Sequence, residues 1–148
     1  MISLLTLRKI KGKSVMNTTM VDKSIMLHLT LESHQYTFLV DTGTRDSIIY
    51  SSSLQNKPLV SAQAFYKSAT VYMANGESVK CPLININVVL KDEGYDKYIY
   101  TTFLVMKNEQ PNKYYDGLLG MSFLEAIKGV IDLEHKKVLY SINDENDD

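Results

Sequence analysis

The residues most suited to carry out chemistry are Asp41, Thr42 and Gly43, which follow the apolar run FLV at positions 38–40. Burying a carboxylate without a partner is costly, and such a group usually takes up a proton instead. A carboxylate at the end of a buried strand therefore either turns out to the surface or is held there for acid–base chemistry. In the first case the triplet is an Asx-type turn, and Gly43 supplies a backbone conformation that other residues avoid.

Other motifs that could carry out chemistry lack a residue that their function requires. The segment GKS at 12–14 resembles the end of a phosphate-binding loop, but the glycine required upstream falls at Leu7. The three histidines have no partner at metal-ligand spacing, so we expect no metal site and no cofactor. Cys81 precedes Pro82 with no evident base, and G-x-S-x-G is absent, so nucleophilic catalysis has no support.

Composition excludes several classes of function. The chain has 148 residues, 45% hydrophobic and 22% charged, which suits one ordinary globular domain. Its net charge of -1 predicts no nucleic acid and no anionic membrane as a partner, and we expect the basic run at 8–13 to be an exposed turn. No apolar stretch could span a bilayer, and residues 1–7 make no convincing signal peptide, so we expect a cytoplasmic protein.

Alternation of apolar and polar residues predicts strands through most of the chain. We expect strands at 24–31, 35–40 and 47–50. The β-branched and aromatic residues of 86–90 and 98–106 predict two more strands, separated by a polar loop at 91–96. The segment 69–83 has two strand-like arms around Asn75-Gly76, and this dipeptide predicts a hairpin with a type I′ turn.

The C-terminal part predicts one helix and a last pair of strands. Residues 121–128 have helical spacing, with Ser122 as a candidate N-cap and Glu125 three residues later. Residues 129–140 predict two short strands around 134–137. We therefore expect an all-β, closed barrel-like domain over 1–142 with one short C-terminal helix, and an acidic disordered tail at 143–148.

Three segments occur in an order that is typical of one protein family. They are FLVDTGT at 38–44, VYMANGESV at 71–79 and DGLLGMSFL at 116–124. Together they resemble the retropepsin-like aspartic proteases, single-domain relatives of pepsin that include the retroviral proteases. In that family they correspond to the active-site loop, to the flap hairpin that closes over bound peptide, and to a segment beside the catalytic loop that precedes a short helix. The resemblance implies a single domain with a fold of the pepsin/retropepsin type, with its core at about 24–140.

The resemblance also implies roles for the loop residues. Asp41 would be the catalytic carboxylate, and Thr42 would hydrogen-bond to the loop of a partner chain. Gly43 would allow close approach of the backbone, and Thr44 would offer its hydroxyl to the outer carboxylate oxygen. Arg45 departs from the small or acidic residue usual in the family. Its positive charge either lowers the pKa of the catalytic carboxylates or changes the substrate preference, or it pairs with Asp46 at the surface.

The remaining carried-over residues lie in the other two segments. The substrate-binding flap would comprise Tyr72, Met73, Ala74, Asn75 and Gly76, and the packing behind the loop would come from Leu118, Leu119 and Gly120. Alternation explains Tyr72 and Met73 equally well as core residues.

Peptide hydrolysis of this kind uses two carboxylates that share one proton. The chain has a single Asp-Thr-Gly and is too short for two lobes, so a working site requires a homodimer with a twofold axis between two Asp41 side chains. The substrate would be an extended polypeptide. The strands expected within 129–133 and 137–142 are candidates for an intersubunit sheet.

Three hypotheses follow. The first is a homodimeric aspartic endopeptidase that activates water with a pair of Asp41 carboxylates. The second is a catalytically inactive retropepsin-like module for dimerisation or peptide binding, since fold does not guarantee activity. The third is a monomeric β-domain in which the triplet is only a turn.

Overall fold

The computed structural model describes residues 14–16, 18–21, 24–62, 67–92, 95–107 and 114–141. The strands are β1 (Ser14–Val15), β2 (Thr18–Val21), β3 (Ser24–Leu31), β4 (His34–Val40), β5 (Ser47–Tyr50), β6 (Ser68–Tyr72), β7 (Ser78–Asp92), β8 (Tyr95–Met106), β9 (Gly117–Leu119), β10 (Val130–Asp132) and β11 (Lys137–Tyr140). The helical elements are α2 (Ser51–Asn56), the 3₁₀ helix η1 (Val60–Ala62) and α3 (Met121–Ala126). The basic run at 8–13 and the acidic tail at 143–148 lie outside the described residues.

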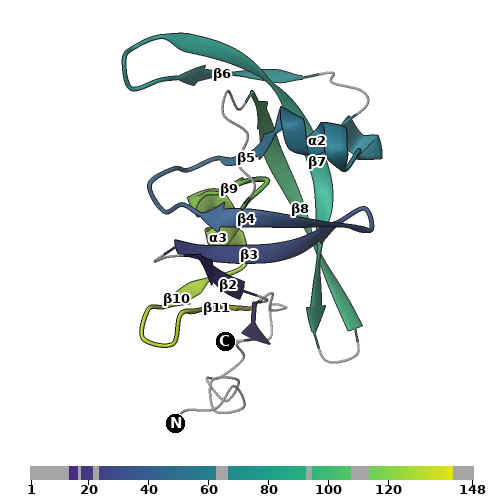
Figure 1. Cartoon of the computed structure of the whole chain (residues 1–148), viewed down its shortest axis with the longest axis vertical. Coiled ribbons are helices and arrows are strands. Elements are labelled where there is room, and N and C mark those ends of the chain that lie inside the picture. Colours follow the sequence, from purple (N-terminus) through teal and green to yellow (C-terminus); the bar gives the residue numbers. More distant parts are fainter. Residues whose placement is uncertain are drawn as a thin grey trace.

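Two sheets make up most of the molecule. Eight strands pair in the order β2-β3-β4-β9-β5-β8-β7-β6, and β1, β11 and β10 form a separate three-stranded sheet. The β6–β7 hairpin lies at one end of the long axis and the β10–β11 hairpin toward the other (Figure 1). The mainly β class is therefore confirmed. Strands β3 and β7 also pair, but over only two residue pairs, so the large sheet is described by its strand order rather than as a closed barrel.

The hydrophobic core is formed by alternate residues of the strands, which point to the same face of the sheet. Leu27, Leu29 and Leu31 of β3 are each at most 2% exposed, as the alternation predicts. The ring of Phe38 on β4 stacks on Phe103 of β8, with centroids 5.3 Å apart. This packing fixes β4, and hence the residue that follows it, against the centre of the large sheet.

The hairpin at Asn75-Gly76 exists, but its turn is not type I′. Met73 N donates to Glu77 O (2.7 Å) and Gly76 N donates to Met73 O (3.0 Å), so the loop contains three residues, 74–76. Gly76 has φ +87°, whereas Asn75 is not among the residues with positive φ. This pattern is a tight turn followed by a glycine in the left-handed region.

A two-residue turn with positive φ at both positions occurs instead between β3 and β4. Leu31 pairs with His34, and Glu32 and Ser33 between them have φ of +49° and +73°. Neither residue is glycine, so the sequence offered no strong signal for this turn type. The Glu32 carboxylate accepts hydrogen bonds from Val60 N (2.6 Å) and Ser61 N (3.1 Å), which anchors the start of η1.

The long β7–β8 ribbon takes the place of three separately predicted segments: the second hairpin arm, the strand at 86–90 and the loop at 91–96. Strand β7 runs without interruption through the end of the predicted hairpin arm and the predicted strand at 86–90. The expected polar loop at 91–96 is mostly paired, because Lys91 lies opposite Asp96 and Asp92 opposite Tyr95. Helix α2, which begins with three serines, was not predicted because it has no apolar periodicity.

Helix α3 is confirmed but shorter than the predicted 121–128. Its N-cap is Gly120 rather than Ser122, and no side chain caps it. At its other end, Lys128 has φ +52°, Lys128 N donates to Glu125 O (3.0 Å), and Gly129 N donates to Leu124 O (2.8 Å). This is the Schellman arrangement, with lysine in the position that glycine usually takes. In the part of the chain that is described, none of the helices has the length and apolar character needed to cross a membrane.

Candidate active site

Asp41 directly follows β4 at the edge of the core. Its backbone N donates to Leu119 O (2.9 Å), which continues the parallel pairing of β4 with β9 by one residue. Its side chain is half-buried, and Gly43 N donates to its Oδ1 (3.0 Å). A Cβ on Gly43 would lie 3.2 Å from that same oxygen, so a glycine here allows the backbone to approach the carboxylate.

The loop after Asp41 is held by the first turn of α3. Met121 N donates to Thr44 O (2.8 Å) and Ser122 N donates to Arg45 O (2.9 Å). The first N–H groups of a helix have no partner within the helix, and here the loop supplies their acceptors. This explains why Ser122 is not needed as a side-chain cap: its amide is already used to hold the loop.

Two glycines allow this close approach. A Cβ on Gly120 would lie 2.5 Å from Asp46 O and 2.6 Å from Arg45 O, and one on Gly117 would lie 1.9 Å from Ile48 O. Backbone atoms cannot yield to such contacts without a shift of the chain. Gly120 N also donates to the buried Ser47 Oγ (3.1 Å), which ties the start of β5 to the end of β9.

Strand β9 supports the loop from behind. It pairs in parallel with β4 and antiparallel with β5, so it lies between the two strands that flank Asp41 in the sequence. Leu119 is fully buried in the core, while Leu118 alternates to the other face and is half-buried. The predicted packing segment thus lies next to the loop, with Leu119 contributing its carbonyl as well as its side chain.

A second carboxylate, Asp116, joins several elements just before β9. Its Oδ2 accepts hydrogen bonds from Thr37 N (2.8 Å) and from the Lys57 ammonium (2.6 Å). Its backbone N donates to Thr37 O (2.6 Å) and its carbonyl accepts from Tyr50 N (2.9 Å). The Lys57 Nζ also lies 4.6 Å from the ring centroid of Tyr36. Asp116 therefore anchors β4, β5 and the end of α2 to one point.

Tyr50, the last residue of β5, is bonded to this anchor through its backbone and lies near Asp41. Its ring packs against Tyr115 at a centroid distance of 6.2 Å. Burial raises the pKa of Tyr50, and the neighbouring Tyr115 and Asp41 raise it further. Tyr50 therefore stays neutral in the range where carboxylates titrate.

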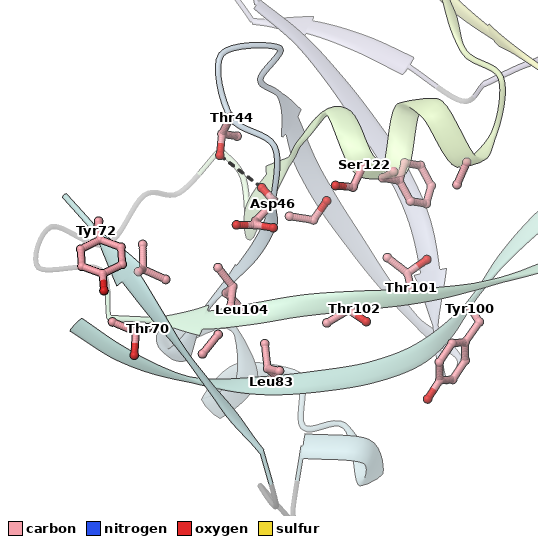
Figure 2. Close-up of a pocket in the computed structure, with 15 residues that line it drawn as sticks. Thr44, Asp46, Thr70, Tyr72, Leu83, Tyr100, Thr101, Thr102, Leu104 and Ser122 are labelled. Atoms are coloured by element: carbon pink, nitrogen blue, oxygen red, sulfur yellow. Dashed lines mark hydrogen bonds between the residues drawn. The ribbon is translucent and has the colours of Figure 1, made fainter. Parts of the chain in front are cut away.

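A cleft of about 650 Å³ opens beside the loop. Thr44, Asp46 and Ser47 line it from the loop and the start of β5, β6 to β8 line it opposite, and α3 lines one side (Figure 2). Tyr72 and Tyr100 lie toward opposite ends of the view (Figure 2). Asp41 itself is not among the lining residues of this cleft in the single chain.

The predicted loop residues occupy varied positions around Asp41. Thr42 is exposed. The Thr44 hydroxyl donates to Asp46 O (3.4 Å) rather than to the Asp41 carboxylate (Figure 2). Arg45 lies near Glu125, with Nη1 3.7 Å from Oε1, so it pairs with α3 and not with Asp46.

The predicted flap residues form the β6–β7 turn. Tyr72 is 76% exposed and lines the cleft, and Met73 is 42% exposed, so neither is a core residue. Ala74, Asn75 and Gly76 form the exposed tip and do not line the cleft. Within the described ranges no three His, Cys, Asp or Glu side chains gather as metal ligands do.

Comparison with solved structures shows which fold this is. The chain is similar to the crystal structure of a retropepsin-like aspartic protease from Rickettsia conorii, with a TM-score of 0.58 and 20% identity over 87% of this chain and 90% of that one. The fold is retropepsin-like. It is also similar to the retroviral protease-like domain of Ddi1 from Leishmania major, with a TM-score of 0.52 and 17% identity over 82% of this chain and 95% of that one. No family model and no curated protein matches the sequence.

Sequence reasoning missed three residues that position the loop of this retropepsin-like fold. Lys57 and Asp116 are 59 residues apart, and Ser47 bonds to Gly120 across 73 residues. No local pattern joins such pairs. The one available signal was Asp116, the acid immediately before the GLLG segment. A carboxylate at the start of a buried strand is costly unless it has a partner.

Proposed function

We propose that this chain is a homodimeric aspartic endopeptidase that hydrolyses peptide bonds in extended polypeptides through a water activated by a pair of Asp41 carboxylates. The observation that supports it best is the placement of Asp41 on a retropepsin-like fold. The carboxylate follows β4 in a loop that β9 and α3 hold through three backbone hydrogen bonds, to Leu119 O, Thr44 O and Arg45 O. A rigid loop that leaves its carboxylate accessible suits a group that must meet a substrate.

The chemistry follows from two carboxylates that share one proton. One carboxylate removes a proton from the attacking water, while the other donates a proton to the oxygen of the scissile carbonyl. Two like charges this close cannot both ionise, so their titration belongs to the pair. Gly43 N would help to hold the ionised oxygen, since it already donates to Asp41 Oδ1 at 3.0 Å.

Each chain would contribute one half of this site. The twofold axis would pass between the two Asp41 side chains, where the exposed Thr42 could reach the partner loop. The three-stranded sheet is the candidate intersubunit surface. Its edge strand β10 carries Val130, which is 45% exposed, and the following turn carries Leu133, which is 77% exposed.

The substrate would lie extended between the loop and the β6–β7 hairpin, which would act as the flap. Strand β6 is the last strand of the large sheet, so one of its edges is open to an added strand. Movement of the hairpin tip at 74–76 would admit and enclose the peptide.

The decisive experiment replaces Asp41 by asparagine, which keeps the shape and removes the titrating group. We expect Asp41→Asn to lower kcat/KM on a fluorogenic peptide library by about 10²–10⁴-fold, while circular dichroism and sedimentation velocity stay as in the wild type. The matched control is Asp96→Asn, which removes an exposed carboxylate near the β7–β8 turn and should leave cleavage unchanged.

Cleavage that survives Asp41→Asn would remove the proposal. A dimer that binds peptides and hydrolyses none between about pH 3 and pH 7.5 would instead favour the inactive binding module. A monomer at high protein concentration would favour an isolated β-domain.

A further inference from the structure

The cleft beside the loop is lined mainly by uncharged side chains. Among the described residues that line it only Asp46 is charged, and the others are hydroxyl-bearing or apolar. Val71, Leu83, Leu104 and Phe123 supply much of the apolar surface. Figure 2 shows Asp46 between the Thr44 loop and the strands that carry Leu83 and Leu104. A single acid above an apolar wall is an asymmetric environment that matches a ligand with an apolar stem and a cationic head.

The Asp46 carboxylate has no intramolecular partner among the described residues. The hydrogen bond from Thr44 Oγ1 goes to the backbone carbonyl of Asp46, and the same carbonyl is the atom that a Cβ on Gly120 would meet, so neither involves the side chain. The adjacent cation, Arg45, is directed to Glu125 instead. The negative charge of Asp46 is therefore left for a ligand.

We propose that the cleft binds a lysine or arginine side chain of the substrate polypeptide, with its methylene groups against the apolar wall and its cation at Asp46. This inference rests on the proposed function, because it names the substrate class of the same site. The cleft volume of about 650 Å³ is in the range of sites that enclose a small ligand, so a long side chain and part of its backbone fit.

The size of the preference follows from the exposure of Asp46, which faces solvent in the single chain. Exposed ion pairs contribute little, and closure of the β6–β7 hairpin over the peptide would strengthen the pair by excluding water. We therefore expect a five- to tenfold preference, on the order of 1 kcal/mol. The preference should decrease as salt is added.

The test compares peptides that differ at one position, lysine against norleucine, scanned through the positions on both sides of the cleaved bond. At one position the wild type should cleave the lysine peptide five- to tenfold faster in kcat/KM. In Asp46→Asn the lysine-to-norleucine ratio at that position should fall to about one, and in Asp46→Lys a glutamate peptide should become preferred over lysine. The control Asp96→Asn should keep the wild-type ratio.

A binding measurement separates failure of this inference from failure of the proposed function. Fluorescence anisotropy of the same peptides with Asp41→Asn should show the lysine preference, and Asp41→Asn/Asp46→Asn should lose it. If the wild type cleaves peptides but has no lysine preference at any position, or keeps it in Asp46→Asn, the inference is wrong and the protease proposal stands. If the wild type cleaves nothing, the anisotropy ratio decides: a preference that depends on Asp46 supports the inference, and equal or absent binding overturns it.

Discussion

Asp116 and Asp41 both lie at strand ends, but their surroundings suit them to different roles. Asp116 is mostly buried and its side chain bonds to a backbone N–H and to the Lys57 ammonium. Asp41 is half-buried, and among the described residues its side chain accepts a hydrogen bond only from the N–H of Gly43. Asp116 is therefore committed to holding the fold, whereas Asp41 keeps acceptor capacity for water, a partner carboxylate or a substrate.

At the same scale, Glu32 predicts a pH dependence of stability. Burial alone would raise the pKa of Glu32, but hydrogen bonds from the Ser61 hydroxyl and from the N–H groups of Val60 and Ser61, with a smaller contribution from His34, lower it overall. A carboxyl with a lowered folded pKa stabilises the protein above its unfolded pKa of about 4.3, and this contribution is lost as pH falls through the folded value. We expect Glu32→Gln to lower Tm by about 2–4 °C at pH 7, corresponding to about 1 kcal/mol.

Thermal unfolding followed by circular dichroism from pH 7 to pH 2.5 checks this. The Tm difference between wild type and Glu32→Gln should shrink toward zero at the acid end, because both then carry a neutral side chain. Glu77→Gln, at the exposed β6–β7 turn, is the control and should show no such pH-dependent difference. A constant difference across the range would mean that the carboxylate charge contributes nothing.

At the scale of elements, the sequence was most informative where the signal is local. Alternation located β3 because burial on one face requires it, and the β-branched and aromatic residues of 98–106 located β8. The Asn-Gly signal located the β6–β7 hairpin but not its turn type, because the pairing of Tyr72 with Ser78 and of Met73 with Glu77 leaves a three-residue loop. The cap of α3 could not be predicted, since its acceptors are carbonyls of a loop about 75 residues away in the sequence.

The anchor between α2 and β9 provides the prediction at this scale. The Lys57 and Asp116 side chains are only 31% and 17% exposed and their charged atoms are 2.6 Å apart, so removing one partner leaves a poorly solvated charge. In a double-mutant cycle of Lys57→Met and Asp116→Asn, we expect a coupling free energy of about 1–3 kcal/mol from urea unfolding.

The exposed pair Arg45–Glu125 is the matched comparison. Its side chains are 74% and 59% exposed and its charged atoms are 3.7 Å apart. The cycle of Arg45→Met and Glu125→Gln should therefore give less than about 0.5 kcal/mol. Equal coupling in the two cycles would show that the Lys57–Asp116 pair is not the anchor its geometry indicates.

At the scale of the whole molecule, the proposed dimer makes activity depend on concentration. The exposed Val130 and Leu133 lie at the edge of the three-stranded sheet, where a lysine would oppose the approach of a second copy. We expect Val130→Lys to raise the dimer dissociation constant at least tenfold, an estimate of more than about 1.4 kcal/mol, in sedimentation velocity. Specific activity should fall in parallel on dilution.

Val60→Lys is the control for this prediction. Val60 is 75% exposed but belongs to η1, which pairs with neither sheet, so the substitution should leave the dimer intact. If Val130→Lys leaves the dissociation constant unchanged while activity persists, the subunits meet through another surface. The sequence could only imply the dimer, because the residue pattern of one chain does not show which surfaces of two copies touch.

The long separation between the Asp41 loop and its supports has a consequence for synthesis. The loop obtains its hydrogen-bond partners from Leu119, Gly120, Met121 and Ser122, and the bond between Ser47 and Gly120 spans 73 residues. Translation proceeds from the N-terminus, so a chain still on the ribosome exposes the acid long before those partners emerge. Each newly made polypeptide is therefore expected to complete the loop around Asp41 only after the residues up to Ser122 have left the exit tunnel.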